Sequence, residues 1–191
     1  MVFLCLLSGL GRFLLKNEDL TPGTAPPDTA FQHVGKYSDQ FNRFLKKSMA
    51  DYFLLIESSV DGNQEKMETS GTALKASLDS FKIEELITDT VLYDAIYLAL
   101  DNVKAETAAI ISDPDMKEKR ASINILSGEL FTILTNLGIR KPVYYWLTCP
   151  DAFGNGKEGG WIGETTASPD PYGCTGEPLV KKRSDMGSTN Q

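Results

Sequence analysis

The chain has 191 residues, of which 41% are hydrophobic and 24% are charged. This composition is typical of a globular protein and excludes a largely disordered chain. The formal net charge of −7 argues against general nucleic-acid binding, because neutralising phosphates requires clustered lysine and arginine.

The N-terminal segment, MVFLCLLSGLGRFLLK, is apolar over about the length of a signal-peptide core. It departs from a standard signal, because no basic residue precedes the apolar run and Arg12 interrupts it. The run is shorter than the ~20 residues that a membrane-spanning helix needs. Two interpretations stay open: a degenerate or mis-started export signal, or a plain amphipathic or disordered start. Membrane association is expected only through this segment.

Two amphipathic helices are predicted in the next part of the chain. The first begins after Ser38, a plausible N-cap, and stops at Asp61-Gly62. The second is a narrow apolar seam in which Gly71 permits the close approach of another helix. The apolar positions are Phe41, Phe44, Leu45, Tyr52, Leu55 and Ile56 in the first helix, and Met67, Gly71, Leu74, Leu78 and Phe81 in the second.

Two further helices follow. The third is predicted to open near Thr88 or Asp89 and to close before Pro114. The fourth is expected to use Asp113 as its N-cap and Pro114 as its first residue, and to end at Gly138 in a left-handed conformation. Their apolar positions are Leu92, Ala95, Ile96, Ala99, Val103 and Ile110, then Ile123, Leu126, Leu130, Ile133 and Leu137.

Four amphipathic helices joined by short turns must bury their apolar stripes against one another. We therefore expect a mainly α fold, with an antiparallel four-helix bundle over residues 36–138. From residue 139 the pattern changes to β-branched and aromatic residues with glycine-rich turns, which predicts a short β-hairpin. Residues 139–180 should form an irregular, Cys-containing appendix of the same domain. Residues 1–35 are interpreted as the signal-like segment with a Pro-rich linker, and residues 181–191 as a disordered tail.

Cys149 and Cys174 flank the predicted hairpin, and Cys5 would be left over. The pair could close a disulfide, hold a soft metal ion, or remain as buried thiols. A disulfide is favoured in an exported protein, because it compensates for a segment with few apolar residues, and a ring of this size contributes roughly 3 kcal/mol. We expect the two sulfur atoms to fasten the appendix onto the helices.

The sequence predicts no catalytic site and no cofactor. The single histidine, His33, lies in the predicted linker, and no serine occupies a nucleophile elbow. The glycine-rich run around Lys157 lacks the Ser or Thr that must follow the lysine of a phosphate loop. Zinc is disfavoured because too few ligands are present, whereas Cu(I) or another soft metal ion accepts two thiolates.

The aromatic residues of the appendix have two interpretations. Trp146 and Trp161 most often represent hairpin packing in such a context, yet two exposed indoles would form a patch for a partner. Together with Asp151 and Tyr172 they are the candidate interaction surface.

An ordered set of motifs runs through the appendix. A tyrosine-containing strand is followed by Cys149-Pro150, Asn155-Gly156-Lys157, Trp161-Ile162, Pro171-Tyr172-Gly173 and Cys174. This order resembles an uncharacterised bacterial envelope domain family. The segment YFLLIESSVDGNQEKMETSGTALKASLDSF is similar to the first helical hairpin of that family. The resemblance covers residues 37–178 and is specific in about the last forty of them.

Members of that family occur as small exported proteins and fused to adaptor subunits of heavy-metal (copper) efflux systems. The resemblance implies a periplasmic or otherwise exported helical domain whose Cys-bearing end contacts a protein partner or a soft cation. Many members carry a methionine directly after Cys-Pro, where this chain has Asp151, and a carboxylate there reduces the preference for Cu(I). The prediction is a non-enzymatic envelope interaction protein; the alternative is a copper-binding domain with Cys149 and Cys174 as ligands.

Overall fold

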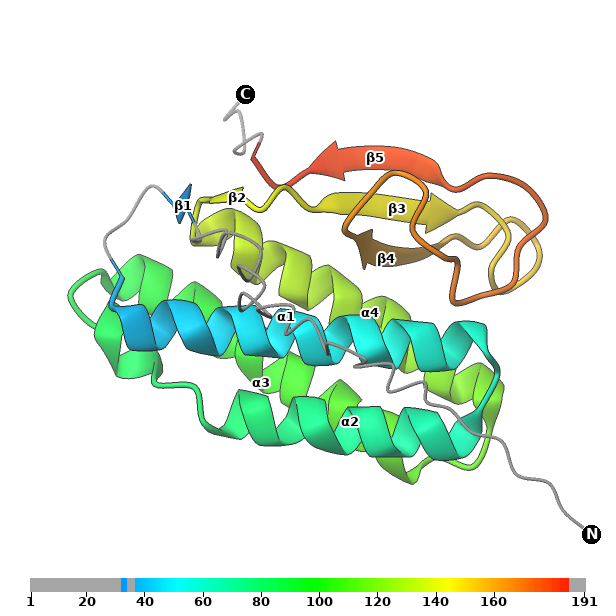
Figure 1. The fold of residues 1–191 in the computed structure, drawn as a ribbon, viewed down its shortest axis with the longest axis horizontal. Helices are drawn as coiled ribbons and strands as arrows, with labels where there is room; N and C mark the ends of the chain where they lie inside the picture. The colour runs from blue at the N-terminus through cyan, green and yellow to red at the C-terminus, as the bar shows by residue number, and fades with distance from the viewer. Residues whose placement is uncertain (1–31, 34–36, 186–191) are drawn as a thin grey trace, which may run out of the picture.

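The computed structural model describes residues 32–33 and 37–185. This part of the chain is mainly helical, with four α-helices and a small antiparallel three-stranded sheet (Figure 1). The helices are α1 (Asp39–Val60), α2 (Gln64–Asp79), the 3-10 helix η1 (Ile83–Leu86), α3 (Thr90–Ser112) and α4 (Met116–Asn136). The strands are β1 (Gln32–His33), β2 (Ile139–Lys141), β3 (Tyr145–Cys149), β4 (Gly159–Gly163) and β5 (Leu179–Arg183).

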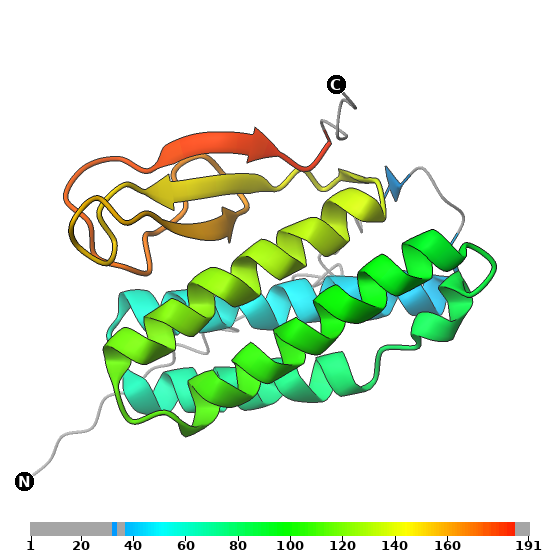
Figure 2. The same ribbon diagram turned by 180° about the vertical axis from the view of Figure 1, so that it is seen from behind.

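The sheet lies over α1 and α4, on the side away from α2 and α3 (Figures 1 and 2). Consecutive helices are neighbours, α1 with α2, α2 with α3 and α3 with α4, and β4 contacts α4. The mainly α class is thus confirmed, while the bundle arrangement stays a prediction. Within the described residues, no helix has both the length and the apolar character of a membrane span.

Local signals in the sequence mark most helix ends correctly. The Ser38 hydroxyl accepts a hydrogen bond from the Phe41 N–H (3.1 Å), and Asp89 caps α3 in the same way. Gly62 and Gly138 adopt φ values of +63° and +65° just after α1 and α4, where the left-handed conformation costs glycine little.

The predicted start of α4 is wrong by two residues. Asp115 is the N-cap, and its carboxylate accepts from the Lys117 N–H (2.8 Å). Asp113 instead ends α3, with an extended ψ of 130°. A residue before proline disfavours the α conformation, so Asp113 is driven out of the helix and the chain turns into α4 only after Pro114.

The core runs continuously from the helices into the sheet. It includes Tyr52 of α1, Ile123 of α4 and Trp161 of β4, all fully buried. Gly71 allows the expected close helix approach, because a Cβ there would lie only 3.1 Å from Cγ1 of Ile111 in α3.

The strand order is β4-β3-β5, and both pairings are antiparallel. The expected disordered tail is therefore wrong for residues 181–185. Residues 181–183 belong to β5, and the Ser184 N–H donates to the Tyr144 carbonyl (2.8 Å). All five β5 side chains are exposed, so backbone pairing with β3 holds the strand, including the basic residues 181–183 that were expected in the tail.

The other chain end also differs from its prediction. His33, expected in a linker, lies in β1, which pairs antiparallel with β2. The rest of the signal-like segment and linker, including Cys5, lies outside the described residues, as do residues 34–36 and 186–191.

Candidate functional site

The candidate site is the appendix, which consists of β3, β4 and β5 with two long loops. The tip loop, residues 150–158, joins β3 to β4, and the covering loop, residues 164–178, joins β4 to β5. Cys149 at the end of β3 and Cys174 in the covering loop lie at disulfide-bonding distance, with Cα atoms 6.2 Å apart. Their pairing would fix the covering loop to the central strand of the sheet.

We expected from the sequence that the two sulfur atoms would fasten the appendix onto the helices. They do not. Both cysteines belong to the appendix itself, because the covering loop folds back over its own sheet. The Ser59 hydroxyl of α1 donates to the Pro171 carbonyl of this loop (3.1 Å), so the loop also has a direct polar contact with the helices.

The edge of β4 provides the main polar attachment. The Ile162 N–H donates to the Tyr52 hydroxyl of α1 (2.9 Å), which also hydrogen-bonds Ser127 of α4 (2.8 Å). The Gly160 N–H donates to the side-chain carbonyl of Asn124 in α4 (2.7 Å). An unpaired strand edge must satisfy its backbone groups, and here helix side chains do so. These roles of Tyr52 and Asn124 were not predicted from the sequence.

Trp161 and Tyr172 are not part of an exposed surface, so this part of the candidate interaction surface is wrong. Trp161 is fully buried, and the ring of Tyr172 packs edge-on against it, with the ring centroids 5.9 Å apart. The Tyr172 hydroxyl donates to the Gly160 carbonyl (2.7 Å). Burial arises because the covering loop carries Tyr172 across the sheet, a long-range contact that local sequence does not reveal.

Trp146 is half-buried and packs against Phe131 of α4, with ring centroids 5.6 Å apart. Its ring lies where a Cβ on Gly160 would be, so β4 needs glycine at that position. Of the four residues in the candidate interaction surface, only Asp151 is exposed.

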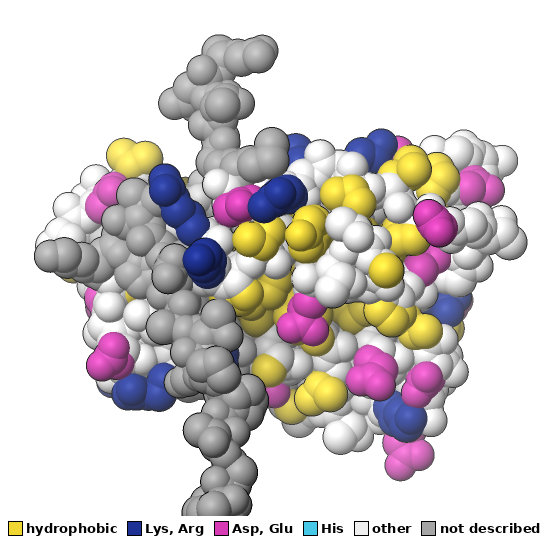
Figure 3. Space-filling model, turned by 45° about the horizontal axis from the view of Figure 1, so that its top comes forward, with side chains coloured by type: hydrophobic (Ala, Val, Ile, Leu, Met, Phe, Trp, Pro, Cys, Tyr) yellow, Lys and Arg dark blue, Asp and Glu magenta, His cyan; other side chains and the backbone are white. Residues whose placement is uncertain are grey.

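The tip loop is largely exposed, as are β5 and much of the covering loop. The Asp151 carboxylate accepts from the Gly156 N–H (2.7 Å), and the Phe153 N–H donates to the Lys157 carbonyl (3.3 Å). Asn155 adopts a φ of 57°, in the left-handed region that asparagine tolerates better than most residues. These contacts give a turn of defined shape with exposed polar side chains. Figure 3 shows the sheet-bearing face, with hydrophobic side chains visible between the sheet and α1 and acidic groups beside them.

A possible metal-ligand set includes one residue that the sequence did not indicate. The sulfur atoms of Cys149 and Cys174 and a carboxylate oxygen of Asp170 all lie within 4.8 Å of one another. The Asp170 oxygens already accept from the N–H groups of Tyr172 (2.8 Å) and Cys174 (2.6 Å), so this carboxylate shapes the covering loop. Asp before Pro in a turn is the sequence signal that could have revealed it.

Burial also dominates the electrostatics of the site. It raises the pKa of the Tyr52 hydroxyl, and it raises the pKa of Tyr172 in the same way, with further increases from nearby Tyr52 and Asp170. Both phenols therefore remain neutral at physiological pH and serve as hydrogen-bonding groups between the sheet, its loop and the helices.

The comparisons with known proteins add no relatives: no protein-family model, no curated protein and no solved structure matches the chain. The resemblance to the bacterial envelope domain family therefore stays a prediction from the motifs of the appendix.

Proposed function

We propose that the protein is a non-enzymatic interaction protein of the bacterial cell envelope. In this proposal an antiparallel four-helix bundle is the platform, and the appendix, cross-linked through Cys149 and Cys174, presents the tip loop to a protein partner. The observation that carries the proposal is the disulfide-bonding distance between these cysteines. Disulfides persist in oxidising compartments, which supports an exported location.

The arrangement of the tip loop supports an interaction role. Its base is held by β3 and β4, and its interior contacts, such as Asp151 with Gly156, limit its conformations. A loop that is already ordered loses less conformational entropy when a partner binds. The buried indole of Trp161 and the attached helices would then act as the support for this loop.

Photo-crosslinking in bacteria tests this function. A photoreactive amino acid in place of the exposed Lys157 in the tip loop should give a discrete crosslinked adduct after export of the full chain. The matched position is Lys117, an exposed lysine in the first turn of α4. Equal adducts at both positions, or none at Lys157, would contradict the proposed role of the tip loop.

The alternative function is a soft-metal domain related to copper handling. Its specific support is the cluster of Cys149, Cys174 and Asp170, which offers two sulfur ligands and one oxygen when the thiols are reduced. Thiolates are preferred ligands of Cu(I), whereas the hard oxygen of Asp170 contributes little to that preference.

Thiol counting distinguishes the two functions. After export, unfolding and maleimide labelling without reductant, the cross-linked protein should show two fewer reactive thiols than after reduction. Cys174→Ser should expose one of them, and loss of the cross-link should lower the free energy of unfolding by about 3 kcal/mol. Free thiols in the exported protein, with stoichiometric Cu(I) binding that Cys149→Ser abolishes, would instead support the copper-binding domain.

A further inference from the structure

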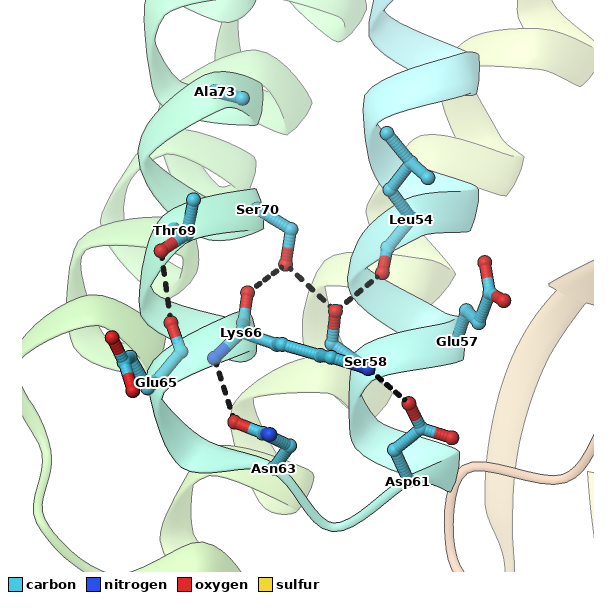
Figure 4. Close-up of a pocket in the computed structure, with 10 residues that line it drawn as sticks. All are labelled: Leu54, Glu57, Ser58, Asp61, Asn63, Glu65, Lys66, Thr69, Ser70 and Ala73. Atoms are coloured by element: carbon cyan, nitrogen blue, oxygen red, sulfur yellow. Dashed lines mark hydrogen bonds and ion pairs between the residues drawn. The ribbon is translucent and has the colours of Figure 1, made fainter.

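A groove of about 630 Å³ lies between the C-terminal part of α1 and the N-terminal part of α2, at the turn that joins them (Figure 4). It is separate from the appendix. Leu54 and Ser58 line it from α1, and Ser70 and Ala73 line it from α2. Its volume lies in the range of binding pockets for small molecules or single peptide side chains.

The floor of the groove offers hydrogen-bond acceptors. The Ser58 hydroxyl donates to the Leu54 carbonyl (2.7 Å), and the Ser70 hydroxyl donates to the Lys66 carbonyl (2.7 Å). The two hydroxyl oxygens lie 3.2 Å apart. Each hydroxyl has only one proton, and the helix carbonyls together with the Ser58–Ser70 hydrogen bond use both, so the two hydroxyls offer a ligand oxygen lone pairs.

The charges around the groove are mainly negative. At the turn end, the Lys66 ammonium pairs with Asp61 (2.8 Å), a contact that raises the pKa of Lys66. Glu57 on α1 and Glu65 on α2 flank the groove on opposite sides. Within residues 37–185 neither glutamate forms an ion pair, although Glu57 also contributes at longer range to the raised pKa of Lys66.

An apolar surface lies between these two carboxylates. Leu54 is 53% exposed at the groove and faces α2, which carries Ala73 on the opposite wall. An occupant that suits this lining combines an apolar side chain with N–H donors that carry positive charge, because the groove provides carbon surface and acceptors but no uncommitted hydroxyl proton.

We propose that this groove binds a basic amphipathic peptide segment of a partner protein. An aliphatic side chain of the segment packs on Leu54 and Ala73, and lysine or arginine side chains on either side meet Glu57 and Glu65. The proposal deepens the proposed interaction function and rests on it for the existence of a protein partner. The groove contains no residue of the appendix, so the groove proposal and the proposed function can be disproved separately.

Fluorescence anisotropy with the full chain tests the groove. The probe is a fluorescein-labelled helical peptide of lysine, leucine and alanine, with leucines on one face. Glu57→Gln with Glu65→Gln should weaken its binding about tenfold, the order expected for two exposed ion pairs. Leu54→Ser should weaken it further, and a peptide with glutamate in place of lysine should not bind.

A matched control excludes nonspecific attraction to an acidic protein. Leu98 of α3 is also exposed, at 64%, and has Asp94 and Asp101 on the same helix. Asp94→Asn with Asp101→Asn should leave peptide affinity unchanged, since neither aspartate lines the groove between α1 and α2. Equal losses for the two double variants would overturn the proposal, as would undetectable binding to the full chain.

Two further outcomes would also overturn it. If the full chain forms a dimer that the Glu57→Gln, Glu65→Gln variant loses, the occupant is a second copy rather than a partner. If the peptide binds only after residues 1–31 are removed, the occupant is the chain's own N-terminal segment. An unchanged tip-loop crosslink in either case would leave the proposed function intact.

Discussion

Replacing Lys119 with alanine is expected to lower the free energy of unfolding by about 4 kcal/mol. Lys119 lies on α4 and is fully buried. Its ammonium donates to the Ile110 carbonyl in the last turn of α3 and pairs with Glu68 of α2 (3.3 Å). Alanine would leave a cavity where the aliphatic stem packs and would remove the hydrogen bond to a buried carbonyl.

Two further variants separate these contributions. Lys119→Met keeps most of the stem, so it should cost only the hydrogen bonds, about 1–3 kcal/mol. Glu68→Gln should cost less than about 1 kcal/mol, because the Glu68 side chain is 45% exposed and its charge is screened by water. Urea unfolding followed by circular dichroism gives all three values. An alanine variant within about 1 kcal/mol of the unmodified protein would show that the buried ammonium is not stabilising.

Lys119 also shows what apolar periodicity overlooks. The predicted seam of α4 begins at Ile123, and Lys119 lies one helical turn earlier on the same face. Lysine is almost never fully buried unless it is paired, yet the four-residue spacing from Ile123 places Lys119 on the core-facing side of α4. A lysine can be buried at such a place because the end of α3 presents a free carbonyl to it.

The helix boundaries were largely predictable because their causes are local. An N-cap such as Ser38 acts on an N–H three residues away, and Gly62 acts through its own backbone. The strand β5 was not predictable in this way. Its pairing with β3 depends on backbone groups more than thirty residues apart, and its side chains carry no apolar pattern.

In the candidate site, too, some features could be predicted from the sequence, whereas contacts between distant residues could not. The two cysteines were visible in the sequence, and the structure brings them together. The partners of the β4 edge were not visible, because the Tyr52 hydroxyl meets a backbone N–H 110 residues away. Tyr52 was predicted as a core residue because it lies on the apolar face of its helix. This helical periodicity does not indicate which group its hydroxyl would bind.

Replacing Trp161 with alanine is expected to lower the free energy of unfolding by about 4 kcal/mol, since it empties a fully buried indole site. The loss of stability should extend from the appendix to the helices. Ile162, the next residue, is bound to Tyr52 of α1, and the core around Trp161 is continuous with that of the helices. We therefore expect the helical circular-dichroism signal and the near-ultraviolet signal of the aromatic residues to show the same, lowered urea midpoint.

The conservative variant Trp161→Phe should cost much less, about 1–2 kcal/mol. Phenylalanine retains most of the packing and removes a buried indole N–H that has no hydrogen-bond partner within the described part of the chain. If Trp161→Ala instead left the helical midpoint unchanged and shifted only the aromatic signal, the appendix would unfold independently of the helices. The helices would then not contribute to the order of the tip loop, which would depend on the sheet, on the contact of Asp151 with Gly156 and on the Cys149–Cys174 pair.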